Sequence, residues 1–166
     1  MKKYNIALVG CGWIGMGAQM DLVRVKPASH AEAISSNSQL KLMGVIDNDA
    51  TALAWKDKLY PEVPHFADPK ALCAFKMPDA VVIATHPDTH CFYIEKFAEL
   101  GVKYIVSFHR KTTNQLQIIH TKDIIIMYNI VLLLEVVEVF FSEVSSSGVS
   151  SGVSDSNKPS IVFLVS

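Results

Sequence analysis

The residues Tyr4-Asn-Ile-Ala-Leu-Val-Gly-Cys-Gly-Trp-Ile-Gly15 decide the fold of this chain. Residues 6–9 are a short run of apolar strand-forming residues, typical of a parallel strand that is buried on both faces. The run leads directly into Gly10, Gly12 and Gly15, in the spacing G-x-G-x-x-G. A strand, this motif and then a helix together predict a dinucleotide-binding turn; the alternative is a glycine-rich turn without a ligand.

Each glycine has a separate predicted role. Gly10 permits the tight turn out of the strand, and Gly12 has no Cβ, so a pyrophosphate can approach the backbone there. Gly15 is predicted to let the next helix lie close to the strand. That helix is expected over residues 16–25, with its free N–H groups and the positive end of its dipole directed at the phosphates.

The composition excludes several classes of protein. A chain of 166 residues suffices for one domain with a core, or for one domain and a tail. A net charge of −1 offers no basic surface for nucleic acid. Cys11, Cys73 and Cys91 are widely spaced and odd in number, which favours a reduced, cytoplasmic chain. The apolar run after Lys2 and Lys3 is too short for an export signal.

The segment after the first predicted helix is longer than usual for this kind of unit. Lys26-Pro27 ends that helix, because proline cannot continue it. Ser29, with Glu32 three residues later, predicts a capping box for a short helix over residues 30–34. We expect the segment up to residue 38 to be a spacer; the alternative is a surface insertion near the adenine or the substrate.

A second strand is predicted over residues 39–46, and it ends at Asp47. A carboxylate at this point accepts hydrogen bonds from the adenosine ribose hydroxyls and repels a 2′-phosphate. Asn48 and Asp49 follow without an arginine, so the pattern favours NAD over NADP. Asp47 stands 32 positions after Gly15, rather than the usual ~20, and the long segment accounts for the excess. The alternative for Asp47 is a turn-forming aspartate. Asp49 suits that role better, as the N-cap of a helix over residues 50–59.

The alternation of strand and helix continues through the middle of the chain. A turn over residues 60–64 precedes a short strand over residues 65–67. Asp68-Pro69 predicts the start of a helix that runs to Phe75. Residues 79–85 are the clearest strand, since they are short, β-branched and almost entirely apolar.

The loop His86-Pro87-Asp88-Thr89-His90 follows this strand, at the edge of the sheet where ligands bind in open α/β folds. Asp88 or Thr89 is predicted to cap a helix that runs to Leu100, and a strand over residues 104–106 comes next. His86 and His90 stand four apart, but they straddle a proline turn and lack a third ligand nearby. We therefore predict no metal site.

Three stretches together resemble the N-terminal domain of the glucose–fructose oxidoreductase and inositol dehydrogenase family (Gfo/Idh/MocA). They are Ile-Ala-Leu-Val-Gly-Cys-Gly-Trp-Ile-Gly at 6–15, Gly-Val-Ile-Asp at 44–47, and Asp-Ala-Val-Val-Ile-Ala-Thr-His-Pro-Asp-Thr-His at 79–90. The last is the most specific, because the family commonly has a strand followed by Thr-Pro-x-x-x-His. The resemblance covers about residues 4–114. It implies an α/β Rossmann domain with a doubly wound parallel sheet.

The resemblance also implies a binding site for NAD, with NADP as the less favoured cofactor. The implied contacts are Gly10, Gly12, Trp13, Ile14 and Gly15 for the pyrophosphate, Asp47 with Asn48 for the ribose, and Thr85, His86, Pro87 and His90 for the central or nicotinamide half. The implied reaction transfers hydride to or from a CH–OH group of a sugar-like or polyol substrate, with the cofactor supplying the hydride chemistry. The alternative is a dinucleotide-binding module or remnant that does not catalyse.

The family's Glu-Lys-Pro motif, whose lysine helps in catalysis, is replaced in this chain. Alignment of the flanking residues puts Phe108-His109-Arg110 at its place. His109 occupies the lysine position and could act as an acid or base, and Arg110 could hold an anion. Neither reproduces the lysine's geometry, so we assign no catalytic residue, and the sequence favours binding over turnover.

The composition changes after residue 114. We predict a dinucleotide-binding domain over residues 1–114, an apolar extension over residues 115–144 and a disordered, Ser/Gly-rich tail over residues 145–166. Residues 124–141 are apolar but interrupted by polar side chains, so a core helix or strand pair is favoured over a membrane tether. Such a sequence is expected of a truncated or frame-disrupted product. Without the family's second domain, we expect no family-type oligomer.

Overall fold

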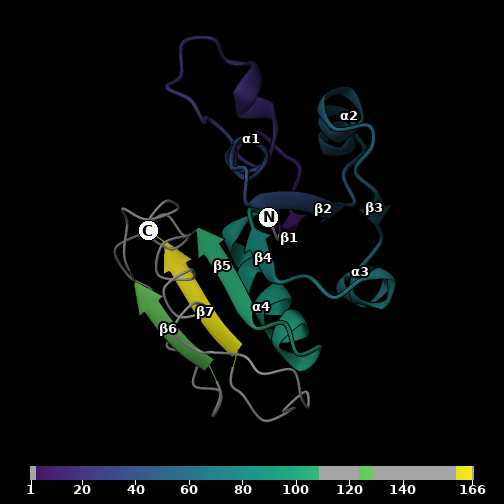
Figure 1. Ribbon diagram of the computed structural model, residues 1–166, viewed down its shortest axis with the longest axis vertical. Coiled ribbons are helices and arrows are strands. Elements are labelled where there is room, and N and C mark those ends of the chain that lie inside the picture. Colours follow the sequence, from purple (N-terminus) through teal and green to yellow (C-terminus); the bar gives the residue numbers. More distant parts are fainter. Residues whose placement is uncertain (1–2, 109–123, 129–159, 166) are drawn as a thin grey trace.

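The computed structural model describes residues 3–108, 124–128 and 160–165. These residues form one parallel sheet with the strand order β3-β2-β1-β4-β5-β7-β6 (Figure 1). The strands are β1 (Tyr4–Val9), β2 (Leu40–Ile46), β3 (His65–Phe66), β4 (Ala80–Ile83), β5 (Tyr104–Phe108), β6 (Ile124–Tyr128) and β7 (Ser160–Val165). The α-helices are α1 (His30–Ser36), α2 (Ala50–Leu59), α3 (Pro69–Phe75) and α4 (His90–Glu99). Two 3₁₀ turns are η1 (Gly17–Met20) and η2 (Pro87–Thr89).

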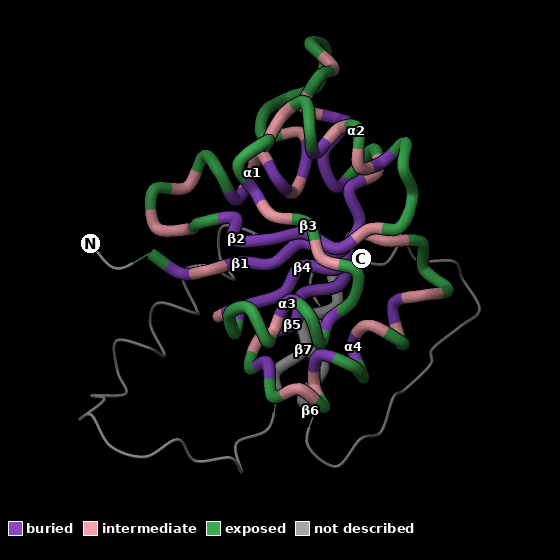
Figure 2. Tube along the Cα trace, turned by 90° about the vertical axis from the view of Figure 1, so that its right-hand side faces the viewer, coloured by how far each residue is buried: buried purple, intermediate pink, exposed green. Residues whose placement is uncertain are grey.

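Helices cover both faces of the strands β1 to β5, and this explains why those strands are apolar throughout. Ile6 and Leu8 of β1 lie in a core cluster with residues of α1 and α2. The alternate residues Ala7 and Val9 lie in a second cluster, with residues of α3 and α4. Figure 2 shows the buried residues concentrated along the strands, with exposed residues in the outer loops. The predicted doubly wound Rossmann fold is confirmed.

The order of the strands reverses at β1. From β1 the chain moves to β2 and β3 on one side, then returns to β4 on the other side of β1. β1 pairs in parallel with both β2 and β4, so the carboxyl ends of the three strands meet at one edge. In open α/β sheets this switch point is where ligands bind.

Three helix starts follow the sequence signals closely. Ser29 caps α1 by accepting a hydrogen bond from the Glu32 N–H at 3.1 Å, while Glu32 accepts one from the Ala28 N–H at 2.7 Å. Asp49 caps α2 through the Thr51 N–H. Asp68 caps α3 in the same way, with proline at the first helical position. These caps were predictable because each involves residues only two to four positions apart.

The predicted helix over residues 16–25 is wrong. Only the single 3₁₀ turn η1 forms there, and Asp21 then accepts a hydrogen bond from the Val23 N–H at 3.0 Å. This local bond competes with helical pairing, and the β-branched Val23 and Val25 also disfavour a helix. The crossover helix is α1, whose first two amides bond to the carbonyls of Ile14 and Gly15.

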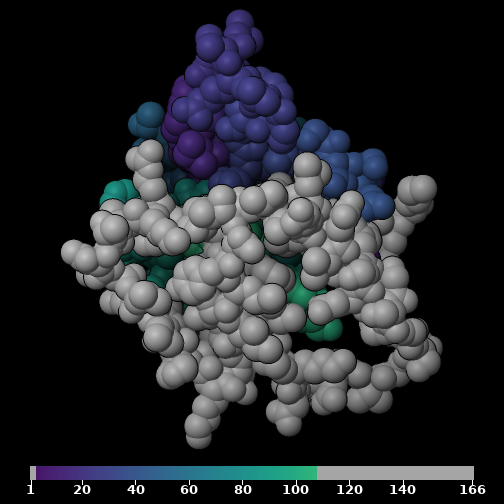
Figure 3. Space-filling view, turned by 90° about the vertical axis from the view of Figure 1, so that its left-hand side faces the viewer, coloured from purple at the N-terminus to yellow at the C-terminus, as the bar shows by residue number. Residues whose placement is uncertain are grey.

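Residues 16–28 thus form an insertion between the glycine turn and its helix. We call residues 21–28 the arm. Leu22, Val23 and Val25 on it are almost fully exposed. In the space-filling view the purple residues, which come from the first part of the chain, project from one end of the molecule (Figure 3).

Two strands lie beyond residue 108. β7 pairs with β5, and β6 pairs with β7. The expected disordered tail over residues 145–166 is therefore wrong at its end, where a β-branched apolar run forms β7. The predicted boundaries at residues 114 and 144 lie outside the described residues and stay predictions. No helix among the described residues has the length and apolar character needed to cross a membrane.

Candidate functional site

The glycine turn after β1 is folded tightly on itself. Gly10 has a φ of +96°, and its N–H donates to the Ile46 carbonyl at 2.9 Å. A Cβ on Gly10 would lie 2.6 Å from the Ala84 carbonyl oxygen, and a Cβ on Gly15 would lie 2.0 Å from the Gly10 carbonyl oxygen. Both glycines are needed by the turn itself. The predicted role of Gly15 in helix packing is corrected: the close neighbour of Gly15 is the turn's own backbone.

Gly12 differs from the other two glycines. A Cβ on it would meet no atom of the described residues within 4 Å. Its carbonyl accepts the N–H groups of Met16 and Gly17, whereas the N–H groups of Gly12 and Trp13 make no hydrogen bond within the described part of the chain. Backbone donors beside open space form a cradle that fits an anion such as a pyrophosphate.

Asp47 ties the end of β2 to the glycine turn. Its Oδ2 accepts the Cys11 N–H at 2.6 Å, and its Oδ1 accepts the Asp49 N–H at 2.9 Å. An ionised carboxylate has about four acceptor positions, so two stay available for a ligand. The carboxylate thus has a structural task that the sequence pattern did not indicate.

Cys11 lies inside this turn with its thiol fully buried. Burial, and secondarily the charge of Asp47, raise its pKa to about 12, although Lys56 acts in the opposite direction. Burial and the Asp47 charge also raise the pKa of the Tyr93 phenol on α4. Cys11 therefore stays a neutral thiol at physiological pH, which argues against a redox role.

The loop after β4 is held by its own side chains. Thr89 Oγ1 lies 2.8 Å from both the His86 carbonyl oxygen and Thr85 Oγ1. His86 Nδ1 lies 2.8 Å from Asp88 Oδ1, at the surface. The prediction that Thr89 or Asp88 caps α4 is right about position, since Thr89 is the N-cap residue, and wrong about chemistry. Its hydroxyl is used within the loop and caps nothing.

His90 is the first residue of α4, and its side chain is buried. Its Nε2 lies 3.0 Å from the Thr85 carbonyl oxygen, and its Nδ1 lies 2.8 Å from Ser107 Oγ. A carbonyl can only accept, so Nε2 carries a proton, and in the neutral ring Nδ1 accepts from the serine hydroxyl. Both ring nitrogens are engaged by the protein. Within the described ranges, no three His, Cys, Asp or Glu residues are grouped to hold a metal.

Trp13 and Ile14 project from the glycine turn and are about half exposed. The Trp13 ring meets the Trp55 ring edge-on, with 6.3 Å between centroids. The guanidinium of Arg24 lies 6.0 Å from the centroid of the Trp13 ring. The arm is therefore connected to the glycine turn.

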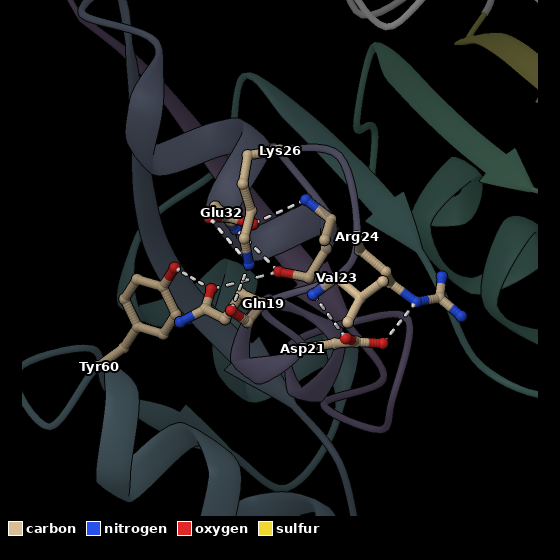
Figure 4. Close-up of polar contacts among 9 residues, drawn as sticks. Gln19, Asp21, Val23, Arg24, Lys26, Glu32 and Tyr60 are labelled. Carbon is tan, nitrogen blue, oxygen red and sulfur yellow. Dashed lines mark hydrogen bonds and ion pairs between the residues drawn. The ribbon is translucent and has the colours of Figure 1, made fainter.

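Gln19 connects the arm to two helices (Figure 4). Its Oε1 accepts from the Tyr60 hydroxyl at 2.8 Å and from Ser29 Oγ at 3.2 Å, and its carbonyl accepts from Lys26 Nζ. Lys26 also pairs with Glu32 at 3.6 Å. These contacts hold the base of the arm against the start of α1 and the end of α2.

Comparison with known proteins places this fold in a family. Residues 4–107 match the profile of Gfo/Idh/MocA, described as an oxidoreductase family with an NAD-binding Rossmann fold. The chain belongs to this family. The matched region of this Gfo/Idh/MocA domain ends at Ser107, one residue before Phe108-His109-Arg110. A search of curated proteins found no match.

Several solved structures of oxidoreductases have a similar fold. A putative myo-inositol dehydrogenase from Sinorhizobium meliloti 1021 is 30% identical, with a TM-score of 0.50, over 64% of this chain and 28% of that one. WlbA dehydrogenase from Bordetella pertussis, solved with NADH and UDP-GlcNAcA, is 24% identical, with a TM-score of 0.50, over 64% and 29%. An Agrobacterium radiobacter oxidoreductase, solved with NAD+, L-tartaric acid and magnesium, is 21% identical, with a TM-score of 0.50, over 64% and 28%.

These likenesses have a limited scope. The chain spans a little over a quarter of the length of the structures it matches, 28% in the first. The likeness to the Bordetella and Agrobacterium enzymes supports the fold alone. The family therefore establishes an NAD-binding Rossmann domain, and the reaction of the whole protein is a matter for proposal.

The structure brings the predicted site residues to one edge. The glycine turn follows β1, Asp47 and Asn48 follow β2, and Thr85 to His90 follow β4. His109 and Arg110 lie outside the described residues, so their predicted position stays a prediction. Ser107 was missed, although a serine within the apolar run Tyr-Ile-Val-Ser-Phe signals a buried polar group that needs a partner.

Proposed function

We propose that this Gfo/Idh/MocA domain binds NAD across the carboxyl edge of β1, β2 and β4. The observation that carries the proposal is the contrast between Gly12 and the other glycines of its motif. Gly10 and Gly15 are required by contacts within the protein, whereas the space beside Gly12 is open. A glycine that the fold does not need, with backbone N–H groups around it, is best explained by a ligand.

Each predicted contact has a place in this proposal. The pyrophosphate binds at the backbone of Gly10, Gly12, Trp13, Ile14 and Gly15. The adenosine ribose binds at Asp47 and Asn48, and the central or nicotinamide half binds along Thr85, His86 and Pro87. His90, also predicted to line this half, is buried with both ring nitrogens engaged by the protein, so its place is behind the loop rather than against the cofactor.

Asp47 supports NAD rather than NADP as the cofactor. Two of the acceptor positions on its carboxylate are used by the N–H groups of Cys11 and Asp49, and the others suit the two ribose hydroxyls. A 2′-phosphate would meet this negative charge, and the next residues, Asn48 and Asp49, bring no cation to offset it.

For the complete protein we propose hydride transfer between the nicotinamide and a CH–OH group of a sugar-like or polyol substrate. The support is the family and the 30% identical myo-inositol dehydrogenase. The cofactor supplies the hydride chemistry, and this chain's residues bind and orient it. A second candidate is a dinucleotide-binding module without turnover, which the replacement of Glu-Lys-Pro by Phe108-His109-Arg110 favours.

Binding is tested by titrating the purified chain with NADH and following the fluorescence of the nicotinamide. We expect saturable binding, lost at least 100-fold in Gly12→Val because the side chain fills the space of the pyrophosphate. Ala74→Val introduces the same side chain at an exposed position of α3 and is the matched control. Equal binding by Gly12→Val and the control would overturn the proposal.

Turnover is tested separately by adding NAD and a panel of polyols to the same preparation. NADH formation supports the oxidoreductase, and binding without NADH formation supports the second candidate. Activity that survives His109→Ala would show that His109 is not the proton donor.

A further inference from the structure

Two polar residues are buried where the core is otherwise apolar. His90 is 4% exposed and Ser107 is 0% exposed. The neighbours of Ser107 along β5, Ile105 and Val106, belong to the apolar core. Burial of a hydroxyl or an imidazole is unfavourable unless each polar atom has a partner. The two residues supply that partner for one another through the 2.8 Å contact of Ser107 Oγ with His90 Nδ1.

The contact links three elements. Ser107 lies near the end of β5, directly opposite Ile83 at the end of β4. His90 begins α4, and its Nε2–H reaches back to the carbonyl of Thr85, the residue at which the β4 loop begins. The ring therefore joins the end of β5 to the start of the loop and to the helix that follows it.

The two hydrogen bonds select one tautomer of the neutral ring. Nε2 donates because the Thr85 carbonyl can only accept, and in the neutral ring Nδ1 then accepts from the Ser107 hydroxyl. A neutral ring with its proton on Nε2 satisfies both partners.

We propose that His90 and Ser107 are positioning residues, whose buried link holds the loop of Thr85 to Thr89 in place for the dinucleotide. In this inference, which rests on the proposed function, His90 acts through the loop and does not touch the cofactor. Thr89 completes the arrangement, because its hydroxyl ties the His86 carbonyl to Thr85 Oγ1 within the loop.

The link also couples the loop to the end of β5. Ser107 directly precedes Phe108, the first residue at the family's Glu-Lys-Pro position. A shift of β5 at this point would be transmitted to the Thr85 carbonyl through one serine and one imidazole. The loop and the end of β5 are therefore expected to be ordered together.

The decisive variant is Ser107→Ala, which removes the donor to Nδ1 and leaves every proposed cofactor contact unchanged. We expect NADH affinity to fall about 3- to 10-fold, the effect of one net hydrogen bond. Val102→Ala is the matched control: it also truncates a fully buried residue next to β5, but outside the link. We expect Val102→Ala to lower the melting temperature and leave NADH affinity within twofold of wild type.

A second measurement does not depend on the cofactor. Hydrogen exchange of a peptide that covers residues 84–91 should be faster in Ser107→Ala than in wild type, and unchanged in Val102→Ala.

A third measurement follows the His90 ring itself. In wild type, two-bond nitrogen–proton spectra should show His90 as the Nε2–H tautomer, with its signals nearly unmoved when NADH saturates the protein.

The outcomes separate this inference from the proposed function. If wild type does not bind NADH, the proposed function fails, and hydrogen exchange still decides whether the link holds the loop. If wild type binds NADH and Ser107→Ala binds equally well, or exchanges no faster over residues 84–91 than Val102→Ala, the positioning role is overturned. A large shift of the His90 signals on NADH binding would instead make His90 a direct ligand.

Discussion

The two loops at the carboxyl edge of the sheet are held in different ways. The glycine turn after β1 is held by its backbone: carbonyls lie where side chains would otherwise be, and main-chain hydrogen bonds close the turn. The loop after β4 is held by side chains, including one from β5 that lies 17 positions away from its partner. The first arrangement requires glycine at fixed positions, because backbone atoms of the turn itself and of Ala84 lie against it. The second requires particular side chains, most of them within the loop and one from β5.

The largest effect should come from adding a methyl group to the backbone-held turn. Gly15→Ala would place a Cβ 2.0 Å from the Gly10 carbonyl oxygen, so the turn must open, at a cost of about 4 kcal/mol or more in unfolding free energy. Gly12→Ala is the matched control and should change stability by less than about 0.5 kcal/mol. Urea unfolding measures both, and equal losses would show that the turn does not depend on this close approach.

Low pH should lower the free energy of unfolding through His30, which is bonded to the same turn. His30 donates its N–H to the Ile14 carbonyl, and its Nε2 is buried. Burial lowers its pKa to about 4 from 6.5. The unfolded chain therefore binds a proton between those values, and stability falls as the pH drops from about 6.5 to 4, by about 3 kcal/mol in total.

The variant His30→Gln isolates this contribution. The difference in unfolding free energy between wild type and His30→Gln should vary with pH across that window and level off below about pH 4. A difference that stays constant with pH would show that His30 titrates normally.

A smaller effect is expected where a side chain supports the backbone-held turn. Asp47→Asn leaves one oxygen for two N–H groups, those of Cys11 and Asp49. We expect a loss of about 2 kcal/mol, the value of a hydrogen bond to a charged group. Asp49→Asn is the control, because asparagine caps a helix as well as aspartate does. If thermal unfolding gave equal losses for both, the tie between β2 and the turn would contribute nothing.

The smallest effect should come from the outside of the side-chain-held loop. Asp88 and His86 pair at the surface with side chains 74% and 84% exposed. Solvent screens such a pair, so Asp88→Asn should leave the melting temperature unchanged. In wild type, the hydrogen bond from His86 holds the pKa of the Asp88 carboxyl below its usual range, which NMR titration can detect. Thr89→Val removes an inner contact of the same loop, and a melting temperature no lower than that of Asp88→Asn would contradict the proposed order.

The sequence predicted the features of the fold that depend on residues close together in the chain. The caps at Ser29, Asp49 and Asp68 each involve residues a few positions apart, and the apolar strands showed their burial directly. The positions of Gly10 and Asp47 followed from the motif and from the end of a strand.

What the sequence did not predict depends on contacts that spacing cannot show. The failed helix over residues 16–25 was decided by a local Asp21 contact that competes with helical bonds. The role of Gly15 depended on the closure of the turn, and that of Thr89 on a bond across the loop. Ser107 required knowledge that β5 lies beside β4 with α4 above them.

The edge-on contact of Trp13 with Trp55 gives the molecule a built-in optical reporter. These are the two tryptophans of the whole chain, and their ring centroids lie 6.3 Å apart. Because Trp13 is part of the glycine turn, all indole emission originates beside the expected pyrophosphate. A shift in that emission would therefore report on this corner of the protein without any label, and energy transfer from indole to a reduced nicotinamide would measure how far away the other end of the ligand lies.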